Sequence, residues 1–200
     1  MKILAFVDLH SNISALKKII KKSKQADLLL CAGDISLFEK QLDKIFELLD
    51  QTKKTVLIVH GNHEEPTTLT KLCKRYKNIV FIHRKIKSFD KAVFIGFGGE
   101  GFSLTSKDFE HFIKKKKREL NELKRKNKKL VLITHAPPFG YLDKVDSHHA
   151  GNKSFRDFIL RFRPLLHICG HFHEHAKKTA TLEKTKIINP GPEGKIIQIA

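Results

Sequence analysis

Cysteine is scarce in this chain, and its pattern excludes two common ways of stabilising a small fold. Only three cysteines occur among the 200 residues, at Cys31, Cys73 and Cys169. Their number is odd, each lies in or beside an apolar stretch, and none forms a C-x-x-C pair, so neither a disulfide framework nor a zinc ribbon is expected. We expect buried thiols in a reducing compartment.

The sequence also lacks a long hydrophobic run. The N-terminal apolar stretch reaches Asp8 too soon to be the core of a signal peptide, and no later run is long enough to cross a bilayer. No internal repeat and no linker divide the chain. Because 40% of the residues are hydrophobic, the chain can bury a substantial core. We expect a single domain over residues 1–200, in the cytoplasm, with no membrane partner.

Acidic residues are few, 21 against 39 lysines and arginines, which gives a formal net charge of +18. A charge of this size bears on partners, solubility and association rate rather than on the fold. It fits a nucleic-acid partner, and it fits equally a lysine-rich composition that keeps proteins apart in solution. No RNA-binding signature, basic zipper or recognition-helix motif selects the first interpretation.

The most basic stretch, residues 107–129, has apolar residues at helical spacing. Thr105 and Asp108 form a capping-box pattern before it. Acidic residues come early and basic residues late, which suits the helix dipole. An amphipathic surface helix with a solvated basic face is favoured over a nucleic-acid contact surface, and both stay open.

Five short apolar runs predict strands that are buried on both faces. They are rich in Val, Ile and Leu and do not alternate with polar residues. They cover residues 2–7, 27–32, 55–59, 130–134 and 165–169. Between the first three lie two amphipathic stretches, 12–23 with Asn12 as its N-cap, and 38–49. This alternation predicts a parallel sheet with right-handed crossovers.

Two further segments, residues 79–97 and 176–199, contain short strand-like pieces separated by turns, without helices between them. Such pieces suggest antiparallel additions to the sheet. Because one segment lies in each half of the chain, two sheets can form and pack face to face. The predicted fold class is therefore α/β, with two packed mixed sheets flanked by helices.

Polar clusters follow the apolar runs directly. Residues at the carboxyl ends of strands in an open α/β sheet converge on one site, even from distant segments. Seven of them have metal-ligand chemistry: Asp8, His10, Asp34, Asn62, His135, His171 and His173. The carboxylate of Asp34 has two oxygens and can bridge two metals. Carboxylate with imidazole suits Mn, Fe, Co, Ni or Zn rather than Ca or a thiolate-type site, and Mn²⁺ is the first expectation.

Two divalent ions in this set would leave positive charge for a phosphate. The ions bring four positive charges, Asp8 and Asp34 offset two, and a bridging hydroxide offsets one more. Two metals about 3.5 to 4 Å apart clamp the attacking and non-bridging oxygens and lower the pKa of bound water to around 7. His63 adjoins Asn62 but is surplus to the ligand set. Its ordinary pKa suits it to protonate the leaving group or to hydrogen-bond the phosphate.

The remaining histidines and a glycine motif have simpler interpretations. His60 and His167 are expected in strands with their rings satisfied by the backbone, and His83 is expected on the surface. Residues 96–101 fit G-x-G-x-x-G, but no acidic residue stands at a later strand end at the right distance, so a dinucleotide site is rejected. A flexible glycine loop near the site is expected instead.

Taken together, these clusters resemble the full motif series of the calcineurin-like metallophosphoesterases. The motifs are Asp8-x-His10, Gly33-Asp34, Gly61-Asn62-His63-Glu64, His135 and Gly170-His171-x-His173. The resemblance implies a four-layer α/β/β/α sandwich with a dinuclear metal centre and His63 near the scissile phosphate. It implies one ion on Asp8, His10, Asp34 and His173, and the other on Asp34, Asn62, His135 and His171.

The segment from 135 to 152 is similar to small prokaryotic members of that family. By this resemblance Gly151 and Asn152 would line the substrate pocket, at a helix N-terminus that can bind an anion. Equally, Asn152 can serve only as the cap of the following helix, and this interpretation is favoured. The chain lacks the Asp-Arg-Gly of the Ser/Thr phosphatase branch and is too short for the appended domain of the family's DNA-repair nucleases.

Three functions are compared. The leading hypothesis is a metal-dependent phosphodiesterase that also accepts monoesters, with a phosphate ester as its substrate. The alternative is a nuclease that acts on DNA or RNA through the basic stretch 107–129. A non-catalytic scaffold is disfavoured, because scaffolding relatives have usually lost metal ligands and this chain has all of them.

Overall fold

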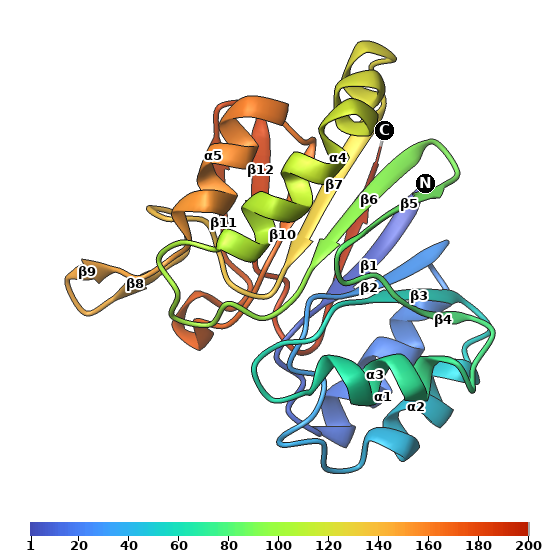
Figure 1. The fold of residues 1–200 in the computed structure, drawn as a ribbon. Helices are drawn as coiled ribbons and strands as arrows, with labels where there is room; N and C mark the ends of the chain where they lie inside the picture. The colour runs from blue at the N-terminus through green and yellow to red at the C-terminus, as the bar shows by residue number, and fades with distance from the viewer. Residues whose placement is uncertain (200) are drawn as a thin grey trace.

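The computed structural model describes residues 1–199 and arranges them in four layers (Figure 1). The first sheet has the strand order β13-β1-β2-β3-β4. Its strands are β1 (Lys2–Phe6), β2 (Leu28–Cys31), β3 (Thr55–Ile58), β4 (Ile79–Phe81) and β13 (Lys195–Gln198). Strands β1 to β4 run parallel, and β13 is antiparallel to β1. The outer face is covered by the helices α1 (Ile13–Ser23), α2 (Leu42–Asp50) and α3 (Pro66–Cys73).

The second sheet has the strand order β11-β12-β10-β7-β6-β5. Its strands are β5 (Lys85–Phe89), β6 (Ala92–Phe97), β7 (Lys129–Thr134), β10 (Leu166–Ile168), β11 (Thr179–Leu182) and β12 (Thr185–Ile188). The four central strands are parallel, and β5 and β11 are antiparallel at the edges. The remaining elements are α4 (Lys107–Arg125), α5 (Lys153–Phe162), the hairpin strands β8 (Lys144–Val145) and β9 (His148–His149), and a 3₁₀ turn (His173–His175).

Three hydrophobic clusters fill the spaces between the four layers, and β1 shows how a strand serves two of them. Leu4 and Phe6 point into the cluster under α1 to α3, whereas Ile3, Ala5 and Val7 point into the cluster between the sheets. The third cluster joins the second sheet to α4 and α5. Successive strand residues face opposite sides, so a strand buried on both faces has an unbroken apolar sequence. The predicted α/β/β/α sandwich of two mixed sheets is confirmed.

The helix predicted over residues 38–49 is wrong at its start. The helix α2 begins at Leu42, and Phe38 lies in the preceding loop with φ 49° and 70% of its surface exposed. Apolar spacing placed Phe38 on a helix face, but the left-handed backbone of Gln41, with φ 61°, cannot belong to a right-handed helix. The other predicted helix is confirmed, because the Asn12 side chain caps α1.

The strand directions predicted for residues 79–97 and 176–199 are only partly correct. Strand β4 pairs in parallel with β3, after a crossover helix α3 that the sequence analysis did not predict. Strand β6 is parallel to β7, and β12 is parallel to β10, while the β5–β6 and β11–β12 pairs are antiparallel as expected. Local pattern indicates a strand but not its direction, because the direction depends on partners far away in the sequence.

The basic stretch forms α4, which ends at Arg125 because the chain must enter β7 at Lys129. The N-cap is Ser106, whose hydroxyl accepts the N–H of Phe109 at 3.0 Å. The predicted capping box of Thr105 and Asp108 is therefore wrong by one residue. No helix among residues 1–199 is both long enough and apolar enough to span a membrane.

Candidate metal centre

The loops that follow β1 and β2 are tied together where the first ligands stand. Asp8 and His10 have φ values of 54° and 46°, which turn the chain sharply after the strand. The N–H of Asp8 donates to the carbonyl of Gly33 at 3.2 Å, and the N–H of His10 donates to the carbonyl of Asp34 at 3.0 Å. Left-handed backbone at non-glycine residues needs such support. The two loops therefore hold each other in place.

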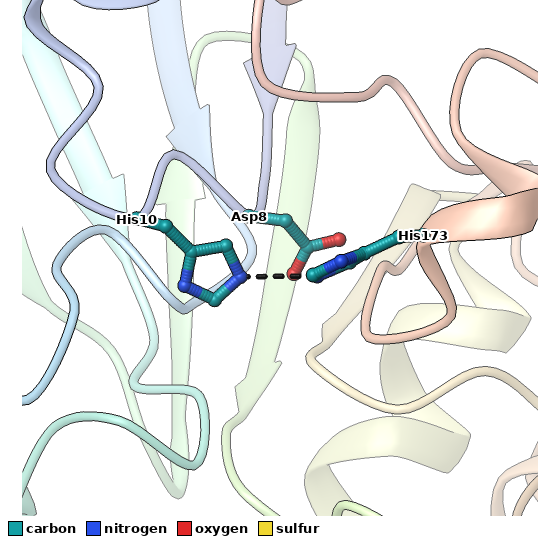
Figure 2. A group of neighbouring side chains, drawn as sticks. All are labelled: Asp8, His10 and His173. Atoms are coloured by element: carbon teal, nitrogen blue, oxygen red, sulfur yellow. Dashed lines mark hydrogen bonds between the residues drawn. The ribbon is translucent and has the colours of Figure 1, made fainter.

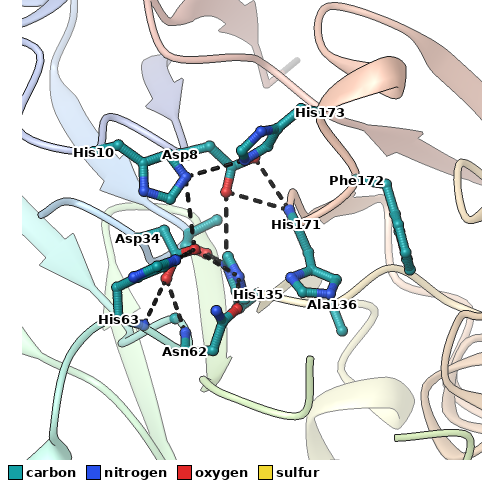
Figure 3. A network of polar contacts seen from close by, with 12 residues as sticks. Asp8, His10, Asp34, Asn62, His63, His135, Ala136, His171, Phe172 and His173 are labelled. Carbon is teal, nitrogen blue, oxygen red and sulfur yellow. Dashed lines mark hydrogen bonds and ion pairs between the residues drawn. The ribbon is translucent and has the colours of Figure 1, made fainter. Parts of the chain in front are cut away.

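Asp34 lies at the centre of the site, with only 2% of its side chain exposed. Its Oδ1 accepts the N–H groups of Asn62 at 2.8 Å and His63 at 3.0 Å. Its Oδ2 lies 3.4 Å from Nε2 of His135, 3.7 Å from Nε2 of His10 and 3.8 Å from Nε2 of His63 (Figure 3). One carboxylate thus faces three imidazoles from three different loops.

His135, which follows β7, is fully buried. Its Nδ1 donates to the carbonyl of Ala32 at 3.0 Å, and its Nε2 lies 3.0 Å from Oδ1 of Asn62. A backbone carbonyl on one ring nitrogen fixes the ring and directs the other nitrogen to a metal in many proteins. The Asn62 oxygen, the Asp34 carboxylate and this nitrogen converge on one point, as ligands of a cation do.

A second group of donors forms around Asp8. Nε2 of His10 and Nε2 of His173 lie 3.0 Å apart beside the Asp8 carboxylate (Figure 2). Asp8 also accepts the backbone N–H of His171 at 3.1 Å. Because Asp8 comes from the first sheet and His173 follows β10 of the second, this group forms only when the two sheets pack.

His171 lies less centrally than the other predicted ligands. Its ring centroid is 5.1 Å from that of His135, and its Nε2 is buried without a hydrogen-bond partner. Among residues 1–199, its ring nitrogens belong to none of the three groups of donor atoms that lie within 4.8 Å of one another. Those groups instead include His63, together with His10 and Asp34.

The charges in the site are coupled. Burial acts to raise the pKa of Asp34, but the hydrogen bond and charge of His135 outweigh it and bring the pKa to about 2. Burial acts to lower the pKa of His135, but Asp34 and Asp8 raise it to about 8. Burial raises the pKa of Asp8 and lowers the pKa of His171 to about 4. A proton on His135 therefore offsets the negative charge of the two carboxylates, as a bound cation would.

The residues present fit a pair of divalent ions. The two buried carboxylates, a carbonyl oxygen and at least three converging imidazoles are hard and borderline donors, which suit transition metals and zinc. His10 and His173 would hold one ion with Asp8, while Asn62 and His135 would hold the other, with Asp34 between them. The unpartnered Nε2 leaves His171 free to serve as a further ligand.

The family is settled by comparison with known proteins. A family model described as calcineurin-like phosphoesterase matches residues 1–175. The chain belongs to this family. Calcineurin-like phosphoesterases are hydrolases that typically bind two divalent metals, and residues 1–199 contain three groups of side chains that could hold a metal ion.

Solved structures share the calcineurin-like fold. A Thermus thermophilus protein aligns with a TM-score of 0.74 at 17% identity, over 96% of this chain and 90% of that one. Phosphopantetheinyl hydrolase from Mycobacterium tuberculosis aligns with a TM-score of 0.68 at 15% identity, over 95% and 88%. A dimetal phosphatase from Danio rerio gives 0.62 at 13% identity, over 94% and 86%. At these identities the likeness shows the fold alone.

A curated relative matches a short segment only. A UPF0046 protein from Caenorhabditis elegans is 46% identical over 44 residues, which is 22% of this chain. The match covers 15% of that protein's length. It therefore shows a local similarity only.

Glu64 was given no role by the sequence analysis, although it stands in the Gly-Asn-His-Glu cluster. Its carboxylate is buried and accepts the backbone N–H groups of Asp34 at 3.1 Å, Gly61 at 3.0 Å and Ser36 at 2.8 Å. Burial raises the pKa of Glu64. Glu64 therefore joins the loops after β2 and β3 behind the ligands, and its position beside His63 was the available signal.

The predicted substrate residues Gly151 and Asn152 lie beneath the surface. Asn152 is fully buried and caps α5, with its Oδ1 accepting the N–H of Phe155 at 3.2 Å. The backbone N–H of Gly151 donates to the buried carboxylate of Asp143 at 2.9 Å. The favoured interpretation of Asn152 as a helix cap is confirmed.

The simpler predictions for other residues need correction. His83 is partly buried rather than on the surface; it accepts the N–H of Gly98 at 3.0 Å, and burial lowers its pKa to about 3. His167 lies in β10, but its Nε2 donates to the Thr134 hydroxyl at 2.7 Å instead of to the backbone. His60 follows the end of β3 and contacts the carbonyl of its neighbour Gly61 at 2.8 Å.

The glycine segment 96–101 is not a freely flexible loop. Gly96 lies within β6, where a Cβ would come 2.4 Å from the carbonyl oxygen of Ile82. A Cβ on Gly98 would come 2.3 Å from the carbonyl oxygen of His60. These glycines allow two stretches of backbone to approach closely.

Proposed function

We propose that this chain is a dinuclear-metal-dependent phosphodiesterase that also accepts monoesters, and that residues 1–200 act as one catalytic domain. The observation that carries the proposal is the convergence on Asp34. Its carboxylate meets His10, His63 and His135 within 3.4 to 3.8 Å. A buried carboxylate surrounded by imidazoles from both sheets is suited to bridge two cations.

When bound, the ions supply Lewis acidity, which makes water acidic enough to yield hydroxide near neutral pH and offsets the charge of the phosphate. We propose Asp8, His10, Asp34 and His173 for one ion and Asp34, Asn62, His135 and His171 for the other, with Mn²⁺ as the first metal to test and Fe, Zn, Ni or Co as alternatives. The buried carboxylates keep two negative charges fixed beneath them.

We propose His63 as the group that protonates the leaving oxygen. Its ring lies 4.9 Å from the His10 ring, and its Nε2 is 3.8 Å from Asp34. Its side chain is 18% exposed, so it is reachable by a substrate at the edge of the cluster. General acid catalysis needs such a positioned group within reach of the leaving oxygen.

The test is hydrolysis of bis(p-nitrophenyl) phosphate by protein loaded with Mn²⁺. Asp34→Ala should lower kcat/KM by at least about 1,000-fold. Asp90→Asn, which removes an exposed carboxylate in the β5–β6 turn, is the matched control and should leave the rate unchanged. Absence of turnover with all five candidate metals, or an unchanged rate in Asp34→Ala, would contradict the proposal.

A second candidate substrate is nucleic acid, favoured by one observation. The outer face of α4 presents a run of exposed basic side chains, at Lys114, Lys115, Lys117 and Arg118. Phosphate contacts release counterions, so binding to single-stranded DNA or RNA should weaken steeply as salt rises. Binding that is insensitive to salt, or unchanged by replacing these four residues with Gln, would exclude the nuclease.

A further inference from the structure

Two phenylalanines beside the metal centre are exposed. Phe38 and Phe102 each leave 70% of their surface open to solvent, the largest fraction of any exposed large apolar side chain in residues 1–199. Single exposed apolar side chains are common on soluble proteins. These two differ because both pack against histidines of the proposed active site, and neither is used by the chemistry described above.

Phe38 lies against the proposed acid. Its ring centroid is 4.4 Å from that of His63, in an edge-to-face arrangement. His63 is proposed to protonate the leaving oxygen, which carries the organic part of the leaving group. The organic part of that leaving group must therefore pass beside the exposed face of Phe38.

The loop that carries Phe38 is held in an uncommon conformation. Phe38 and Glu39 have φ values of 49° and 61°, which bulky residues rarely adopt. The Ser11 hydroxyl fixes the loop by donating to the carbonyl of Lys40 at 2.7 Å and accepting the N–H of Leu37 at 3.1 Å. Such backbone persists only where surrounding contacts enforce it, and it gathers at functional sites. The phenyl ring is thus held outward by its loop.

Phe102 occupies the corresponding place on the other side. Its ring centroid lies 4.6 Å from that of His171 and 5.6 Å from that of Phe172. The loop is anchored at the next residue, where Nδ2 of Asn152 donates to the carbonyl of Ser103 at 2.8 Å. Asn152 therefore acts on the site indirectly, by holding the loop that presents Phe102.

His63 and His171 lie on opposite sides of His135 in Figure 3, and Phe38 and Phe102 pack against these two histidines. A phosphodiester carries two organic groups, each joined through its own oxygen to a tetrahedral phosphorus, so the two groups diverge from one another. We propose that Phe38 and Phe102 are specificity-determining residues that select phosphodiesters bearing flat aromatic rings, with the leaving group on Phe38 and the retained group on Phe102. This inference rests on the proposed phosphodiesterase function.

The ligand chemistry is that of a planar ring, such as a nucleobase or a simple aryl group. Every nucleobase has a π-face, so stacking on phenylalanine tolerates different bases. The ring of Phe38 packs against His63, and the ring of Phe102 packs against His171 and Phe172. Selection for a ring rather than for one base is therefore expected.

The first experiment detects the ring contact by fluorescence rather than by a rate. The sequence contains no tryptophan, so Phe38→Trp introduces a single indole at the proposed contact. In the metal-loaded protein, adenosine monophosphate should quench the indole emission saturably, whereas ribose 5-phosphate should not. Leu160→Trp, which replaces an exposed residue on α5, is the control and should respond to neither. Equal responses to both ligands, or no response in Phe38→Trp, would overturn the assignment of Phe38.

The second experiment separates the two rings by substrate. Phe102→Leu should lower kcat/KM about tenfold for the p-nitrophenyl ester of thymidine monophosphate and change methyl p-nitrophenyl phosphate by less than about twofold. Phe38→Leu should lower both rates about tenfold, because both substrates lose the same aromatic leaving group, and Phe38→Tyr should restore them. Equal losses for both substrates in Phe102→Leu, or failure of Phe38→Tyr to rescue, would overturn the proposal.

A third substrate identifies the kind of ring. If benzyl p-nitrophenyl phosphate is as sensitive to Phe102→Leu as the thymidine ester, then any flat ring is selected; if it is insensitive while the thymidine ester is not, then a nucleobase is selected. Both outcomes support the proposal. If the wild type hydrolyses none of the three substrates, the proposed function is contradicted. The indole titration tests the ring contact independently of these rates.

Discussion

The two sheets contribute side chains of different charge to the same site. The loops of the first sheet supply both carboxylates, Asp8 and Asp34, which are buried. The loops of the second sheet supply only imidazoles, at His135, His171 and His173. In the proposed centre, the first sheet would therefore supply the charge that attracts cations, and the second sheet would add imidazole ligands. Neither sheet holds a full ligand set alone.

Two side-chain contacts join the loops of the two sheets at the site. Nε2 of His135 lies 3.4 Å from Asp34, and Nε2 of His173 lies 3.0 Å from that of His10. Each contact joins a residue of one half to a residue of the other. The centre is thus a product of sheet packing, and variants on the two sides should fail in different ways.

The largest difference is expected in metal binding. Asp34→Asn should weaken the binding of both ions by about 1,000-fold, because the two ions lose a carboxylate that they share. This loss is larger than the roughly 10- to 100-fold effect of altering a residue that only contacts a ligand. His135→Gln should remove one ion and retain the other. Calorimetric titration with Mn²⁺ gives the number of ions that each variant binds, and Asp90→Asn is the charge-matched control for Asp34→Asn. Loss of the same number of ions in both variants would contradict the shared role of Asp34.

The next effect concerns His63, also from the first half. His63→Asn should lower kcat about 100-fold for diesters with alkyl leaving groups. The loss should be much smaller for p-nitrophenyl esters, since a stable phenolate needs no proton to leave. The stoichiometry of metal binding should not change. An equal loss for both kinds of leaving group would show that His63 positions a metal or the phosphate instead of donating a proton.

Two asparagine N-caps, one in each half of the chain, allow the stability of the two halves to be compared. Asn12 caps α1 at an exposed position, and Asn152 caps α5 at a fully buried one. Asn12→Ala should lower the free energy of unfolding by about 1 kcal/mol, and Asn152→Ala by about 2 kcal/mol, because burial leaves the freed N–H of Phe155 without water. Urea unfolding measures both. An equal or smaller loss for Asn152→Ala would contradict the difference in burial.

The last effect is a pH dependence to which a buried histidine of the second sheet contributes. Burial lowers the pKa of His167 to about 3, below its ordinary value near 6.5 in the unfolded chain. Between these values the unfolded state holds a proton that the folded state lacks, so the free energy of unfolding falls with decreasing pH, by up to about 1.4 kcal/mol per pH unit. His167→Gln should have a shallower slope between pH 6 and 4. An unchanged slope would exclude His167 as the cause.

Much of the fold and nearly all candidate ligands could be predicted from local sequence. The run Lys2–Phe6 is apolar at both alternating sets of positions, which directly reflects burial on two faces. Asp8, His10 and Asp34 immediately follow such runs, so their meeting at one sheet edge follows from parallel strands. The cap at Asn12 was recognisable because its hydrogen bond reaches only three residues along the chain.

The errors arose where a decision depended on distant contacts. Apolar spacing could not show that Phe38 leaves the helix, because its backbone is set by the Ser11 hydrogen bonds and by packing on His63. The parallel direction of β4 depends on its pairing with β3. Glu64 stands beside His63 in the sequence, but its hydrogen bonds to the N–H groups of Asp34 and Ser36 form only when the loops around it close.

The sequence by itself determined the strand ends, the alternation that builds a layered α/β fold and the chemistry of the ligand set, because each depends on neighbouring residues. Tertiary structure alone decided which donors meet at Asp34, that His171 lies apart from the tightest groups, and that two exposed phenylalanines pack against histidines of the site. These depend on the packing of two sheets whose residues lie more than a hundred positions apart, and no local spacing specifies that distance in space.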